Sequence, residues 1–139
     1  MTEIPAALIA AYEATEYRVR APRAFTLRVG QWSAELSEVY AAQKVASAGF
    51  LTACNPFSRA ASEEDNRRAQ QDLVHRLAGL GLVTMPAIGV DPSGDWPGEE
   101  SVFVPGLTLD QACALGNEFG QNAVLWADAD AVPRLVLLR

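Results

Sequence analysis

The sequence predicts an α+β fold, with one domain over residues 1–139 in which three to four helices pack against a mixed β-sheet. Two observations predict this class. Segments with the period-two hydrophobic pattern of strands alternate with segments that have the hydrophobic period of a helix. Some successive strands have connections short enough for hairpins, whereas others are separated by a helix, so hairpins and crossovers are both expected. A chain of 139 residues is long enough to bury one hydrophobic core.

The first three elements are a helix and two short strands. Residues 5–12 predict the helix, because apolar residues recur every fourth position and a proline suits the first turn. Residues 17–20 and 25–29 alternate between apolar and polar side chains, which predicts a hairpin. Four arginines lie on or beside the polar face of this pair. They are Arg18, Arg20, Arg23 and Arg28. A solvated face that discourages edge pairing is the expected role, and a surface for phosphate or an acidic partner is the alternative.

A second helix and a buried strand follow. Ser33 is a good N-cap residue, and Glu35 is favourably placed in the first turn of the helix. The strand begins at Phe50 and is apolar at both parities as far as Cys54, the pattern of a strand covered on both faces. It ends at Asn55-Pro56, because proline cannot continue the hydrogen-bond ladder. The chain therefore leaves the sheet in a turn that carries polar side chains.

The third helix is expected over residues 62–80, with an N-cap serine and three acidic residues in the first turn. Its apolar stripe places Asn66 on the inner face and directs His75 away from the core. Residues 83–90 predict a strand. Pro86 within this strand predicts that it is an edge strand or carries a bulge.

The remaining elements are three strands and a helix. Residues 91–98 form a loop by composition, and residues 99–104 return as a strand antiparallel to the one before. Residues 108–119 begin with a Thr-Leu-Asp-Gln capping box, which predicts a helix. Residues 123–127 form another apolar strand, and residues 135–138 form the last.

Composition bounds the function. Half of the residues are hydrophobic and a fifth are charged, which is typical of a soluble globular protein. The net charge of −6 argues against broad nucleic-acid binding. We expect no membrane span, because no apolar run reaches about 18 residues, and the N-terminus lacks a secretory signal. Cys54 and Cys113 are expected as small core residues, so a cytoplasmic protein is predicted. A single histidine and no Cys-x-x-Cys pair argue against a zinc site, and no residue is assigned as a metal ligand.

Polar residues collect at the ends of the predicted strands and helices. Those expected to contact a ligand are Thr52, Asn55, Ser58, Asn66, Asp91, Trp96, Glu99, Ser101, Gln121 and Asn122. Amides both donate and accept hydrogen bonds, so an amide-rich pocket would suit a small polar ligand or a peptide of a protein partner. Asn55, after the strand at Phe50, can meet Gln121 and Asn122, before the strand at Ala123, only if these two strands are antiparallel. The alternative is that the same side chains bind turn backbone and have only an architectural role.

Three carboxylates define a second hypothesis, an enzyme. Asp91, Glu99 and Glu100 could act as general acid and base or hold a divalent cation. The alternative is a solvated loop with an Asx-turn at Asp91. Trp96 in the same loop could be a lid over a ligand or a plug onto the sheet. An enzyme would bring at least two of these carboxylates into contact with Asn55. The residues themselves name no catalytic group and no cofactor.

Four segments carry a resemblance to a known family. They are Thr52 to Ser58, Asn66, Gly89 to Ser101, and Phe119 to Trp126. With its Thr-Ala-x-Asn-Pro and Gln-Asn-Ala motifs, the chain resembles the family numbered 3293 among the domains of unknown function, a group of small bacterial proteins. Cys54 stands where the family more often has an aromatic residue. The resemblance implies a bacterial protein but neither an activity nor a catalytic residue.

Overall fold

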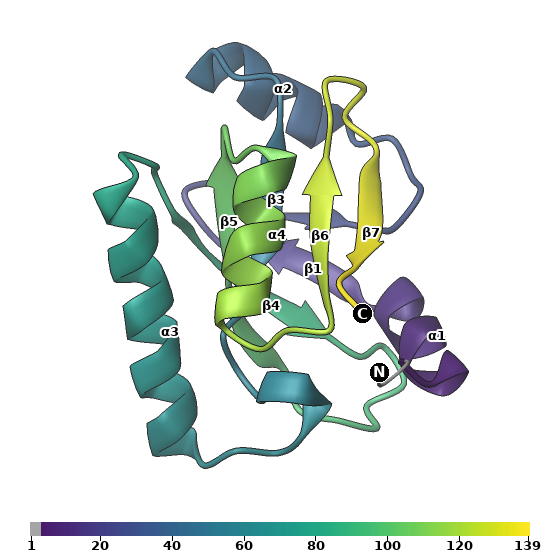
Figure 1. Ribbon diagram of the computed structural model, residues 1–139. Helices are drawn as coiled ribbons and strands as arrows, with labels where there is room; N and C mark the ends of the chain where they lie inside the picture. The colour runs from purple at the N-terminus through teal and green to yellow at the C-terminus, as the bar shows by residue number, and fades with distance from the viewer. Residues whose placement is uncertain (1–3) are drawn as a thin grey trace.

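The computed structural model describes residues 4–139 and contains one seven-stranded sheet (Figure 1). The expected lack of a secretory signal rests partly on residues 1–3, which lie outside this range. The strand order is β2-β1-β4-β5-β3-β6-β7. The strands are β1 (Glu16–Val19), β2 (Phe25–Leu27), β3 (Ala48–Leu51), β4 (Met85–Val90), β5 (Glu99–Pro105), β6 (Ala123–Ala127) and β7 (Pro133–Leu137). The helices are α1 (Ala6–Ala14), α2 (Ala34–Gln43), α3 (Glu63–Gly79) and α4 (Leu109–Glu118), with a 3-10 turn η1 (Pro56–Ser58).

The predicted α+β class is confirmed, but the sheet is antiparallel throughout rather than mixed. The helical crossovers that suggested parallel pairs do occur, since α3 joins β3 to β4 and α4 joins β5 to β6. Each crossover skips a strand. β5 lies between β3 and β4, and β3 lies between β5 and β6. Two strands that run in the same direction are therefore always separated by one that runs in the opposite direction.

Helices cover both faces of the central strand β3. Ala48 and Phe50 belong to one apolar cluster with Leu36 and Tyr40 of α2. Leu51 belongs to a second cluster, to which α3 and α4 contribute. Figure 1 shows α4 lying over β5, β3 and β6, with α3 beside it. All four residues of β3 are buried, which confirms the prediction of a strand covered on both faces, but the strand begins before Phe50 and ends at Leu51 rather than at Cys54.

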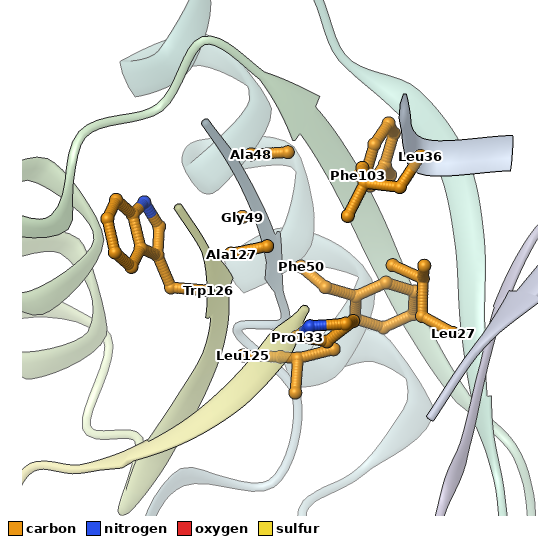
Figure 2. A pocket seen from close by; sticks show the side chains of 10 residues that line it. All are labelled: Leu27, Leu36, Ala48, Gly49, Phe50, Phe103, Leu125, Trp126, Ala127 and Pro133. Atoms are coloured by element: carbon orange, nitrogen blue, oxygen red, sulfur yellow. The ribbon is translucent and has the colours of Figure 1, made fainter. Parts of the chain in front are cut away.

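The α2 side of the sheet is filled by aromatic rings. Tyr17 packs edge-on against Phe50 with ring centroids 5.1 Å apart, and Phe25 packs edge-on against Phe103 at 5.6 Å. A cavity of about 10 Å³ remains among these side chains (Figure 2). Because its lining is apolar and its volume is at most that of one water molecule, this cavity is a packing defect of the core and cannot hold a ligand.

The prediction that Pro86 marks an edge or bulged strand is wrong. β4 is an interior strand with regular register to β1 and β5. The reason is that β1 pairs only as far as Ala87. Beyond that point the Pro86 carbonyl accepts a hydrogen bond from the Arg20 backbone N–H at 2.8 Å. The missing N–H of proline therefore falls where the neighbouring strand has already ended, and costs no ladder bond.

The three longer helices begin at the predicted caps. The side chains of Ser33, Ser62 and Thr108 each accept a hydrogen bond from the backbone N–H three residues later, and Thr108 with Gln111 forms the expected capping box. None of the helices in residues 4–139 is both long and apolar enough to span a membrane.

Candidate functional site

The end of β3 and the start of β6 lie at the same edge of the sheet. The two strands are antiparallel, with Phe50 opposite Leu125, which is the arrangement on which the predicted site depends. The Gln121 side chain crosses this edge, and its Nε2 donates to the Cys54 carbonyl at 3.1 Å. The predicted amides at the two strand ends are therefore neighbours.

Beyond the end of β3 the chain has no neighbouring strand to accept its backbone hydrogen bonds. Two side-chain amides of α3 accept them instead. The backbone N–H of Ala53 donates to Oε1 of Gln70 at 2.9 Å, and that of Asn55 donates to Oδ1 of Asn66 at 2.8 Å. Four residues of a helix rise about 6 Å. Two residues of a strand advance about 6.6 Å. Because these lengths match, side chains at i and i+4 on α3 satisfy alternate backbone groups of the extended chain.

Asn55 is the centre of the turn. Its Oδ1 accepts from the Ala61 backbone N–H at 3.0 Å and from Nδ2 of Asn66 at 2.9 Å. Its Nδ2 donates to Oε2 of Glu99 at 2.9 Å. Asn55, Phe57 and Ser58 all have φ between 48° and 59°, in the left-handed region that is costly for residues other than glycine. Such strain persists where surrounding contacts impose it and is often found at functional sites.

Glu99 is a partly buried carboxylate without a cationic partner among the described residues. Burial raises the pKa of the Glu99 carboxyl above its usual range, and the hydrogen bond from Asn55 only partly offsets this. Its neighbour Glu100 is exposed and pairs with Arg20 at 3.3 Å. The two side chains point to opposite faces because they are consecutive in β5.

The contacts of Asn55 lie at the start of the turn. At its end, Ser58 belongs to a separate polar cluster that includes Tyr12 of α1. The hydroxyl groups of Tyr12 and Ser58 are hydrogen-bonded to each other. Nδ2 of Asn122 lies 3.2 Å from the Tyr12 hydroxyl and 3.4 Å from the Ser58 hydroxyl. Tyr17 links this cluster to β1, because its hydroxyl donates to the Tyr12 carbonyl at 2.6 Å.

The other predicted site residues have local partners. The Thr52 hydroxyl donates to the Glu100 carbonyl at 2.6 Å, and that of Ser101 donates to the Glu99 carbonyl at 2.9 Å. Asp91 accepts hydrogen bonds from Ser93 and from the Asp95 backbone within its own loop. The Ser93 hydroxyl holds the pKa of Asp91 below its usual range. Trp96 is partly buried in this loop, which is compatible with both of its expected roles.

The sequence interpretation missed three residues of this region, Gln70, Tyr12 and Tyr17. Gln70 was detectable, because it lies one helical turn after Asn66 on the same face. Tyr12 and Tyr17 carry no motif that connects them with a turn some 40 residues later. Cys54 was expected as an inert core residue. It is buried, and burial raises the pKa of its thiol, with the nearby Glu99 and Glu100 charges adding to the shift.

The four arginines of the predicted basic face each meet a carboxylate. Arg18 and Arg28 pair with Glu16, and Arg23 pairs with Glu38. Arg20 pairs with Glu100 as described above. This is the arrangement of a solvated face with local charge compensation. Exposed pairs of this kind contribute little to stability.

Two further features bear on the chemistry of the molecule. Within residues 4–139, no three histidine, cysteine or acidic side chains converge in a group that could hold a metal ion. A surface hollow of about 430 Å³ lies between α3 and α4, lined by Asp72, His75, Arg76, Glu118 and Phe119. None of the predicted site residues lines this hollow, and an ion pair of 2.9 Å between Arg76 and Glu118 lies in it.

The fold and the site define a small α+β protein whose central strand ends in a strained turn held by side-chain amides. Residues 51–124, more than half of the chain, match the family described as Protein of unknown function (DUF3293). The chain belongs to this family, as its motifs predicted. All of the predicted site residues lie within the matched segment. Searches of the curated proteins and of the solved structures gave no match.

Proposed function

We propose that this protein is a binding module that receives a small polar ligand or a peptide at the Asn55–Ser58 turn. Glu99 anchors the ligand through a cationic or N–H donor group. The observation that carries the proposal is that Glu99 is partly buried beside Asn55 and has no cation among the described residues. A desolvated carboxylate of this kind is unfavourable alone and gains most from a ligand that supplies positive charge.

The strain of the turn supports the same proposal. Three non-glycine residues within four positions have a left-handed backbone, although a simple strand ending needs none. Amides from α3 and from the start of β6 hold this backbone in place. A site built in this way is rigid before the ligand arrives, which lowers the entropic cost of binding.

An enzyme is the weaker candidate. Only Glu99 of the three candidate carboxylates has a hydrogen bond to Asn55, whereas Glu100 is on the opposite face and Asp91 is engaged within its loop. The raised pKa of Glu99 is the one feature that favours acid–base catalysis. With a single suitable carboxylate, binding is the function that the geometry supports better.

We also propose a cytoplasmic setting in a bacterium, one domain within residues 1–139, and no general affinity for nucleic acid. The first two rest on the sequence and its family resemblance. The last is supported by the net charge of −6 and by the local pairing of the arginines of the β1–β2 face.

The test is a thermal-shift screen of the wild-type protein against amino acids, amines, nucleotides and divalent cations. A compound that binds only the folded state raises the unfolding midpoint by mass action. We expect a cationic compound to do so in the wild type and in Glu100→Gln, but not in Glu99→Gln or Asn55→Ala. Glu100→Gln is the matched control because it removes an adjacent charge on the opposite face. A midpoint shift that survives in Glu99→Gln would contradict the proposed anchor.

A further inference from the structure

Helix α1 is less buried than the other three helices, each of which has at least two buried residues. It has no side-chain N-cap, no acidic residue in its first turn and no basic residue in its last. None of its nine residues is buried. Isolated helices of this length are marginal in water, so α1 depends on its contacts with the rest of the molecule.

The side-chain hydrogen bonds between α1 and the site are made by Tyr12. The Tyr12 hydroxyl is hydrogen-bonded to the exposed hydroxyl of Ser58 and to Nδ2 of Asn122, two groups that together are called the niche here. The Tyr17 hydroxyl of β1 donates to the Tyr12 carbonyl at 2.6 Å. The end of α1 therefore lies at the Ser58 end of the proposed site.

We propose that α1 is a displaceable lid and that the niche of Ser58 and Asn122 binds an aromatic hydroxyl group of the ligand, whose place Tyr12 occupies in the free protein. This inference rests on the proposed function and adds the ligand chemistry and the regulation of the same site. The niche already accommodates a phenol, which shows that a group of this shape and polarity fits there.

The exchange of one hydroxyl for another is close to balanced. Asn122 offers N–H donors, and Ser58 both donates and accepts, so an incoming phenol can form the same hydrogen bonds that Tyr12 gives up. The remaining cost is that of undocking α1, which exposes its half-buried residues Leu8, Ile9, Ala11 and Tyr12 but no fully buried one. The lid lowers the apparent affinity for ligand by the fraction of molecules in which α1 is undocked.

The first experiment measures amide hydrogen exchange of α1 in the wild type, Tyr12→Phe and Tyr40→Phe. Tyr40 is the control because its hydroxyl donates to backbone carbonyls far from α1. We expect Tyr12→Phe to raise exchange in α1 at least fivefold and to leave β3 and β6 unchanged, and Tyr40→Phe to leave α1 unchanged. Unchanged exchange of α1 in Tyr12→Phe, or an equal increase in β3 and β6, would overturn the lid.

The second experiment uses p-cresol and toluene as matched probes that differ by the hydroxyl. We expect p-cresol to accelerate exchange in α1 of the wild type, toluene not to, and Asn122→Ala to remove the effect of p-cresol. Equal effects of the two probes, or no effect of p-cresol, would overturn the hydroxyl niche. A cationic ligand that depends on Glu99, found without any release of α1, would overturn the lid and leave the proposed function intact. Release of α1 by a ligand whose binding does not depend on Glu99 would leave the lid intact and overturn Glu99 as the proposed anchor.

Discussion

Asn55 and Asn66 are hydrogen-bonded to each other twice. Oδ1 of Asn66 accepts from the Asn55 backbone N–H at 2.8 Å, and Nδ2 of Asn66 donates to Oδ1 of Asn55 at 2.9 Å. The same Asn55 side chain donates to Glu99. The pair therefore joins α3 to the end of β3 and fixes the amide that faces the carboxylate. The architectural role and the proposed binding role of these asparagines are two consequences of one arrangement.

Replacement of Asn66 by alanine tests the architectural part. We expect Asn66→Ala to lower the free energy of unfolding by about 1–2 kcal/mol, because it leaves the Asn55 N–H and Oδ1 without this partner. Urea unfolding at constant m-value measures the change. Asn117→Ala is the control, since Asn117 is an exposed residue of α4, and it should change stability by less than about 0.5 kcal/mol. Equal effects of the two substitutions would show that the asparagine pair contributes nothing particular.

The backbone and side-chain contributions of Asn55 can be separated. Asn55 has φ of 48°, a conformation that costs a residue with a Cβ about 1–2 kcal/mol and costs glycine nothing. Both Asn55→Gly and Asn55→Ala lose the side-chain hydrogen bonds, so Asn55→Gly should be the more stable variant by about 1 kcal/mol. Thermal unfolding of the two proteins side by side measures this difference. If alanine proved equally stable, the turn would have relaxed out of the left-handed region.

The helices and strands were predictable because their signals are local. The caps Ser33, Ser62 and Thr108 each act within one helical turn, and the alternation in β1 and β2 is visible within a few residues. Strand order was not predictable in the same way. The insertion of β5 between β3 and β4 depends on pairing between strands far apart in the chain, which no local pattern encodes.

In the site too, features with a local signal were predictable and features that depend on long-range contacts were not. Asn55 was predictable because a proline ends the apolar stretch that continues from β3, and Asn66 because the apolar stripe of its helix fixes its face. The partnership of Asn55 with Glu99 follows from the register of β3 against β5, in which Leu51 faces Val102. The contact of Tyr12 with Ser58 depends on where α1 docks on the finished sheet. Sequence reasoning could therefore name Asn55, Asn66 and Glu99, but neither their pairing nor the part played by Tyr12.

Two helical glycines should respond to alanine in opposite directions. A Cβ on Gly116 of α4 would lie 2.5 Å from Cδ1 of Leu138 and 2.7 Å from Cγ1 of Val124. We expect Gly116→Ala to destabilise the protein by about 1–3 kcal/mol through overpacking. A Cβ on Gly79 of α3 would meet no atom within 4 Å, so Gly79→Ala should stabilise by up to about 1 kcal/mol through helix propensity. Unfolding midpoints in guanidinium chloride test both, and a stabilising Gly116→Ala would show that Leu138 moves aside freely.

The stability of the wild type relative to Glu99→Gln should depend on pH. Burial raises the folded-state pKa of Glu99 above its ordinary value of 4.5, so the folded protein binds the proton more tightly than the unfolded chain. The stability that protonated Glu99 contributes is fully present below the unfolded pKa and is lost as the pH rises through the folded pKa. Glutamine stays neutral and its Oε1 still accepts the hydrogen bond from Asn55. Glu99→Gln should therefore gain stability relative to the wild type as the pH is raised from about 4 to 7.

Unfolding free energies at a series of pH values, expressed as the difference between the variant and the wild type, give this profile. The corresponding difference for Glu100→Gln reports the effect of removing an adjacent exposed charge, and is subtracted. If this free-energy difference still rises with pH after the subtraction, ionisation is unfavourable at Glu99 itself. Glu99 is the carboxylate that the proposed function assigns to ligand binding. A difference that stays flat, or falls with pH, would mean that Glu99 is satisfied as a carboxylate without a ligand, and the reason to expect a cationic ligand there would be gone.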